Sequence, residues 1–213
     1  MPPLRYCSDI GAAARGSNQS MGVCLRKILA GIALLAAFAA PPAWAGDGRT
    51  GWSATLYGGP YTTNITSDIF LHGAFNVRGG MVGLAVERRL LNLGWDISFG
   101  AEAQVTHYFG GDNYSTGAFG VGFRLDRFPW NNTSFSVYTG PSYTPSPPLI
   151  GRYLHRQVRL LNYIGLEFAV AIPHHERHWD AVLRVYHRSG VWGVYSDNVD
   201  EGSMIGVGIR ARF

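Results

Sequence analysis

Three residues near the end of the chain have side chains that could cooperate in nucleophilic catalysis. They are His187, Ser189 and Glu201. A serine hydroxyl becomes a good nucleophile when a neighbouring base takes its proton, and a carboxylate can orient that base. Neutral imidazole suits the role of base because its pKa lies near physiological pH. We therefore treat these three residues as a candidate Ser-His-Glu triad, with Ser189 as the attacking group.

The two segments that carry these residues alternate in polarity with a period of two, as β-strands with two different faces do. Counting in twos places His187 and Ser189 on the apolar face of the first segment. In residues 201–213 the same counting places Glu201 and Ser203 on the apolar face. The apolar residues that share these faces include Leu183, Val185, Val207 and Ile209. We therefore expect all three triad candidates on one apolar surface.

The same alternation recurs upstream and predicts eight strands. No helical periodicity of useful length appears after residue 45, and residues 90–93 are predicted to form only a short turn. A Gly/Asp/Asn cluster at 110–113 is typical of a turn. The alternating segments are residues 52–59, 81–89, 95–106, 115–127, 133–143, 160–172, 179–190 and 201–213.

One face of these segments is apolar and aromatic, and the other carries Asp, Glu, Arg, Gln and small residues. A soluble sandwich or a lipocalin-like barrel would also alternate, but its polar side would face water. An export signal, connections of alternating length and a terminal Phe213 favour an outer-membrane barrel instead. We predict an all-β fold, an eight-stranded antiparallel transmembrane β-barrel in the outer membrane of a Gram-negative bacterium. Its interior would be filled by side chains, with Arg, Asp and Glu paired inside.

Residues 1–45 read as an upstream segment followed by a cleaved signal peptide. A positively charged start precedes an apolar run at 28–40, and a small-x-small cleavage site ends at Ala45. The run is too short for a membrane-spanning helix, which needs about 20 apolar residues. We expect Met21 to be the initiator and residues 46–213 to form the barrel.

The cysteine positions and the charge balance bear on disulfide bonding and on nucleic-acid binding. Both cysteines, Cys7 and Cys24, precede Ala45, so no disulfide is expected in the barrel. The formal net charge of +4 belongs mostly to the precursor, because residues 46–213 hold 14 arginines against 13 acidic residues. The charge balance therefore gives no argument for binding nucleic acid.

The spacing of the triad candidates carries a resemblance to a known family. His187-x-Ser189, then Glu201 and a G-x-G-x-R-x-R-F ending, resembles the lipid A 3-O-deacylase family (PagL type). The resemblance covers the last two strands in detail and the rest in outline. It implies hydrolysis of the ester-linked 3-hydroxyacyl chain at position 3 of lipid A, with no metal or other cofactor. Ser189 would be the nucleophile, His187 the general base and Glu201 its orienter.

The resemblance also implies partners and further site residues. The partners would be lipopolysaccharide in the outer leaflet, membrane lipids and, in a homodimer, a second copy of the chain. The family commonly has Asn directly after the serine, whereas this chain has Gly190. A backbone N–H can stabilise an oxyanion and glycine permits its close approach, so the Gly190 N–H is the candidate donor. The expected acyl-chain contacts are Leu183, Val185, Val207 and Ile209.

Two basic clusters have two interpretations each. Arg152, Arg156 and Arg159 follow a proline-rich loop, where they either contact lipid A phosphates or form a solvated charge cluster. His174, His175 and His178 suggest either a metal site or a polar periplasmic turn. For the whole chain, the alternatives to the esterase are a non-catalytic small barrel with a structural or surface-binding role and a palmitoyltransferase-type barrel.

Overall fold

The computed structural model describes residues 51–62, 72–73, 76–111, 113–146, 158–175, 178–190, 194–195 and 200–213, without the side chain of Asp200. The predicted signal segment, residues 1–45, lies outside these ranges. Within them, no helix is long and apolar enough to span a membrane.

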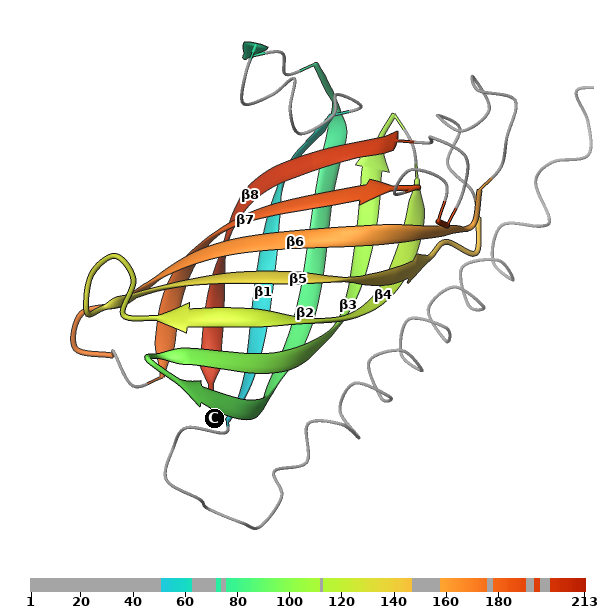
Figure 1. Ribbon diagram of the computed structural model, residues 1–213. Coiled ribbons are helices and arrows are strands. Elements are labelled where there is room, and N and C mark those ends of the chain that lie inside the picture. The colour runs from blue at the N-terminus through green and yellow to red at the C-terminus, as the bar shows by residue number, and fades with distance from the viewer. Residues whose placement is uncertain are drawn as a thin grey trace, which may run out of the picture. The chain divides into compact units, whose positions relative to one another are not determined.

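Eight strands close into an antiparallel barrel (Figure 1). Each strand pairs with its neighbours in the sequence, and the last strand pairs with the first. The predicted fold class is therefore confirmed. The strands are β1 (Trp52–Thr62), β2 (Val77–Gly94), β3 (Ile97–Gly110), β4 (Tyr114–Asp126), β5 (Thr133–Tyr143), β6 (Leu160–Ala171), β7 (Trp179–Ser189) and β8 (Asp200–Arg212).

Strand β2 is longer than its polarity pattern predicts. The expectation of a turn at residues 90–93 is wrong, because the β2–β3 pairing continues to Gly94 opposite Ile97. The turn lies instead at Trp95 and Asp96, which both have positive φ. The pairing has two register irregularities in this part of β2. The sequence there, Leu90-Leu91-Asn92-Leu93, lacks the period of two on which the prediction relied.

The connections define two rims of the barrel. We call the rim with connections 63–76, 111–113, 144–159 and 190–199 the long-loop rim, and the rim with connections 95–96, 127–132 and 172–178 the short-turn rim. The first and last strands begin and end at the short-turn rim, where Ser53 pairs with Arg212 (Figure 1). The expected alternation of long and short connections holds except at 111–113, which has only three residues between β3 and β4.

The outward face of the barrel is apolar. Large side chains remain well exposed along it, including Phe119, Phe123 and Val207, at 54%, 54% and 70%. Apolar surface of this extent is unfavourable in water and matches the hydrocarbon of a bilayer. The closed backbone pairing meets the other requirement of lipid, since a barrel leaves no sheet edge unpaired.

The interior is filled by paired charges and by tyrosines. Glu167 accepts from Arg184 at 3.0 Å and from Arg210 at 2.7 Å, and all three side chains are at most 3% exposed. The expectation of internal charge pairing is therefore confirmed. Toward the long-loop rim aromatic rings take over, and Tyr108 stacks on Tyr114 with ring centroids 4.3 Å apart. The other large side chains of the same buried cluster are Tyr57, Tyr61, Met81, Tyr138, Tyr163, Tyr186 and Met204.

Candidate active site

Strand β7 carries His187 and Ser189 to the long-loop rim. His187 alternates with buried Tyr186 and Arg188, and it follows outward-facing Leu183 in steps of two. The prediction that His187 lies on the apolar outward face is therefore confirmed. Ser189 is the last residue of β7 and is only 9% exposed.

The contacts of His187 are compatible with Nε2 as the basic nitrogen of the ring. Its Nδ1 lies 3.1 Å from the Gly202 carbonyl oxygen and 3.0 Å from Ser203 Oγ. A proton on Nδ1 can be donated to the Gly202 carbonyl, and the lone pair is then on Nε2. In this tautomer Nε2 can accept a proton, as a Ser-His pair requires.

Ser189 is separated from the imidazole along the strand. Residues two apart on one face of a β-strand lie about 6.6 Å apart, and among the described residues no hydrogen bond joins Ser189 to His187. Catalytic hydrogen bonds are often long before substrate binds. The two side chains therefore need a rotamer change or a bound substrate to bring them together.

Glu201 does not share the outward face with His187. Arg188 pairs with Gly202 while Ser189 pairs with Asp200, so Glu201 is the extra residue of a β-bulge. Its carboxylate forms an ion pair with Arg188, and these side chains are 5% and 1% exposed. The expectation from counting in twos is wrong here, because the bulge shifts the parity by one residue. The triad role of Glu201 stays a prediction.

Gly202 makes the bulge possible. Its φ is +128°, a conformation that L side chains rarely adopt. A Cβ atom at this position would lie 2.2 Å from the Thr62 carbonyl oxygen on β1. The Tyr61 hydroxyl also donates to the Glu201 carbonyl oxygen, so β1 supports the bulge from its other side. The Gly202 carbonyl reaches His187 because this backbone turns sharply.

The predicted acyl-chain contacts form one strip on the outward wall. Leu183 pairs with Val207 across β7 and β8, and their side chains are 48% and 70% exposed. Ile209 is 42% exposed and Val185 is half-buried. Their outward placement is confirmed, and the strip leads from His187 toward the short-turn rim. Contact with an acyl chain stays a prediction.

The remaining predicted site residues are only partly described. Gly190 is buried, and its carbonyl accepts from the Tyr195 N–H at 3.1 Å. Arg159 is exposed, whereas Arg152 and Arg156 lie outside the described residues. In the described ranges, which include His174, His175 and His178, no group of three or more His, Cys, Asp or Glu residues could hold a metal ion.

Polarity counting also missed a second Ser-His pair and an asparagine on the outward wall. His107 Nδ1 lies 3.0 Å from Ser115 Oγ across β3 and β4, again near the long-loop rim. Asn162 on β6 is the direct cross-strand partner of Ser189. The signal for Asn162 was present, since it follows the parity of the outward residues Ile164 and Leu166. Only the strand register reveals that it lies beside Ser189.

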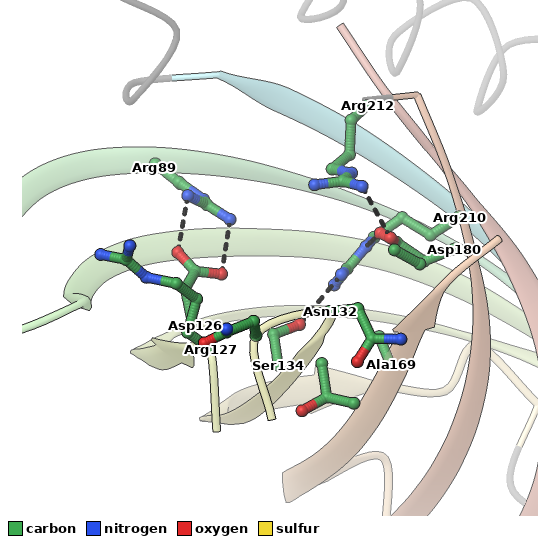
Figure 2. Close-up of a pocket in the computed structure, with 12 residues that line it drawn as sticks. Arg89, Asp126, Arg127, Asn132, Ser134, Ala169, Asp180, Arg210 and Arg212 are labelled. Carbon is green, nitrogen blue, oxygen red and sulfur yellow. Dashed lines mark hydrogen bonds and ion pairs between the residues drawn. The ribbon is translucent and has the colours of Figure 1, made fainter. Parts of the chain in front are cut away.

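A cavity of about 380 Å³ opens at the short-turn rim, away from these residues (Figure 2). Five of its charged side chains are paired with one another: Arg89 with Asp126 at 2.8 Å, and both Arg210 and Arg212 with Asp180 at 2.7 and 2.8 Å. The sixth, Arg127, pairs with Asp96 of the neighbouring turn. Ser134 completes the set by accepting from Arg210 at 3.1 Å. These pairs close the interior charge network, and we assign the cavity no ligand.

The fold and the outward residues together define an eight-stranded barrel of the outer-membrane type, with His187 on its apolar wall and Ser189 two residues further along the same strand. No protein-family model matches the chain, and no curated protein matches its sequence. Among solved structures, the N-terminal β-barrel domain of Pseudomonas aeruginosa OprF is similar with a TM-score of 0.47 at 11% identity, covering 78% of this chain and 98% of that one.

Two further barrels are similar to a comparable degree. The outer-membrane enzyme PagL has a TM-score of 0.47 at 10% identity, covering 76% of this chain and 98% of that one. Yersinia pestis outer-membrane protein Ail, in a phospholipid nanodisc, has a TM-score of 0.43 at 14% identity, covering 77% and 99%. Likeness at this level does not separate an enzyme from other barrels, so the function has to be argued from the site.

Proposed function

We propose that this chain is an outer-membrane esterase of a Gram-negative bacterium that hydrolyses the ester-linked 3-hydroxyacyl chain at position 3 of lipid A. The observation that carries the proposal is the outward placement of His187 near the long-loop rim, with Ser189 two residues further on at the end of β7. A nucleophile on a lipid-facing wall meets molecules dissolved in the membrane. The choice of the lipid A ester rests on the resemblance of the C-terminal sequence.

In the proposed reaction, Ser189 Oγ attacks the ester carbonyl and His187 Nε2 takes its proton. The proton then passes to the departing sugar oxygen, which leaves an acyl-serine. Water attacks this intermediate with His187 again as base and releases the 3-hydroxy fatty acid. The Gly190 N–H is the proposed backbone donor to the oxyanion, and the strip that includes Leu183 and Val207 holds the acyl chain. The mechanism uses no metal.

Glu201 enters the proposal as a positioning residue. Its ion pair with Arg188 and the hydrogen bond from Tyr61 to its carbonyl hold the bulge. The bulge in turn presents the Gly202 carbonyl to His187 Nδ1 at 3.1 Å. Glu201 would then orient the imidazole through the backbone rather than by direct contact.

A non-catalytic barrel with a structural or surface-binding role is the second candidate. It is favoured by the interior position of the Glu201 carboxylate, which is engaged by Arg188. In this case His187 and Ser189 would be interfacial polar residues near a strand end. The two candidates differ in whether lipid A loses an acyl chain.

The test is to refold the protein in detergent, incubate it with lipopolysaccharide and record the mass spectrum of the lipid A. Wild type should remove one 3-hydroxyacyl group, and Ser189→Ala should remove none. Ser115→Ala is a matched control, because Ser115 also contacts an outward histidine at the same rim. It should behave as wild type. Identical spectra for wild type and Ser189→Ala would favour the non-catalytic barrel.

A further inference from the structure

Asn162 places a side-chain amide beside the proposed nucleophile. It is the direct partner of Ser189 in the β6–β7 pairing, and that pairing has no register shift. Directly opposite residues on adjacent strands share a face and have Cβ atoms about 4.5–5.5 Å apart. Asn162 and Ser189 are 6% and 9% exposed, so the two polar groups are covered although their strands face outward here.

A hydrogen-bond chain on β5 holds the Asn162 amide. Its Nδ2 donates to Thr139 Oγ1 at 2.9 Å. The Thr139 hydroxyl can in turn donate to the Tyr163 carbonyl oxygen at 3.0 Å. Thr139 Oγ1 also lies 3.3 Å from Asn162 Oδ1, so this hydroxyl contacts both ends of the amide and holds it against β5. The amide nitrogen carries two protons, and this contact uses one.

We propose that the second N–H of Asn162 donates a hydrogen bond to the oxyanion that forms when Ser189 attacks the ester. This inference rests on the proposed esterase function. When the Ser189 Oγ–carbon bond forms, the electron pair of the carbonyl moves onto its oxygen, and the amide stabilises that charge without transferring a proton. Asn162 would act together with the Gly190 N–H, approaching from the neighbouring strand.

The geometry of the site suits this role better than a purely structural one. An oxyanion donor is effective when it is already oriented and shielded from water before the charge develops. Asn162 meets both conditions, since Thr139 anchors its amide and only 6% of the residue is exposed.

The experiment compares kcat and KM of refolded full-length variants on lipopolysaccharide, and their rates of labelling by an alkyl fluorophosphonate. Asn162→Ala should lower kcat by about 100- to 1000-fold, the typical effect of losing one oxyanion donor, with a smaller change in KM. Asn162→Asp keeps the side-chain size but removes the donor, so it should also lose kcat. Asn132→Ala, at the short-turn rim, is the matched control and should keep wild-type rates.

The variant Thr139→Val distinguishes a catalytic role of the Asn162 amide from the anchoring role of Thr139. It removes the anchor but leaves the amide, so it should cost less kcat than Asn162→Ala. Equal losses in the two variants would overturn the assignment, as would an Asn162→Ala or Asn162→Asp enzyme that folds and keeps the wild-type kcat. In both cases the esterase itself stands if Ser189→Ala is inactive. If wild type shows no more hydrolysis than Ser189→Ala, the proposed function fails and the role of Asn162 fails with it.

Discussion

At the residue scale, the ion pair of Glu201 with Arg188 contributes to stability directly and to the candidate site only indirectly. Both side chains are inside the barrel, where a charge without its partner is costly. The proposed chemistry of Ser189 and His187 depends on this ion pair only indirectly, because the bulge at Glu201 positions the Gly202 carbonyl that contacts His187. Substitution of the carboxylate should therefore affect folding as well as activity.

We predict that Glu201→Gln destabilises the barrel by about 3–5 kcal/mol, because it leaves the Arg188 charge buried beside a neutral amide. Unfolding by urea in detergent, followed by tryptophan fluorescence, measures the change. The double variant Arg188→Met/Glu201→Leu removes both charges and should recover most of the lost stability. An unchanged unfolding midpoint for Glu201→Gln would contradict the interior ion pair.

At the scale of elements, the β-bulge at the start of β8 determines how His187 is held. The backbone at Gly202 carries the carbonyl that accepts from the imidazole, and it does so with a φ of +128°. A residue with a Cβ atom would be strained and would also clash with the Thr62 carbonyl. The bulge is thus a feature of both the fold and the candidate site.

We predict that Gly202→Ala lowers stability by about 1–3 kcal/mol, the usual cost of forcing an L residue into such a conformation. Hydrolysis of lipid A should fall as well, since the His187 acceptor moves. Gly117→Ala is the matched control, because nothing lies within 4 Å of a Cβ atom at that strand position. Equal stability of the two variants would show that the bulge tolerates a side chain.

The same bulge marks the limit of what the sequence could predict. Alternation along β4 to β7 correctly assigned the inward and outward residues, because a strand without irregularities keeps its period of two. It failed at Glu201, where one extra residue inverts the parity, and at Leu90 to Leu93, where β2 continues without alternation. Asn162 was visible as a polar residue on an apolar face, but its position beside Ser189 depends on the register between strands, which one strand's pattern cannot give.

At the scale of the whole barrel, the apolar outer wall requires a lipid environment. Val207 lies near the middle of β8 and is 70% exposed, whereas Val194, 76% exposed, lies in the connection between β7 and β8. Val207 belongs to the apolar outer wall and Val194 does not. A charge introduced at each position should therefore have different effects on the stability of the barrel in lipid.

We predict that Val207→Arg destabilises the barrel in lipid vesicles by about 2–4 kcal/mol, the cost of arginine at the bilayer midplane. Val194→Arg should have little effect. The faster gel migration of the unheated folded protein provides the measurement, taken across a urea series in vesicles. Equal effects of the two substitutions would argue against membrane burial of β8.

Closure of the barrel joins parts of the chain that are far apart in the sequence. Seven of the eight strand pairings are hairpins between consecutive strands, but β1 must meet β8, and the Tyr61 hydroxyl reaches a carbonyl 140 residues away. Loop-closure entropy makes such a distant contact one that we expect to form late in folding. The bulge that holds His187 would therefore be completed only when the seam closes. A chain still in transit to its membrane would lack an ordered site, so the architecture itself would delay hydrolysis until insertion is finished.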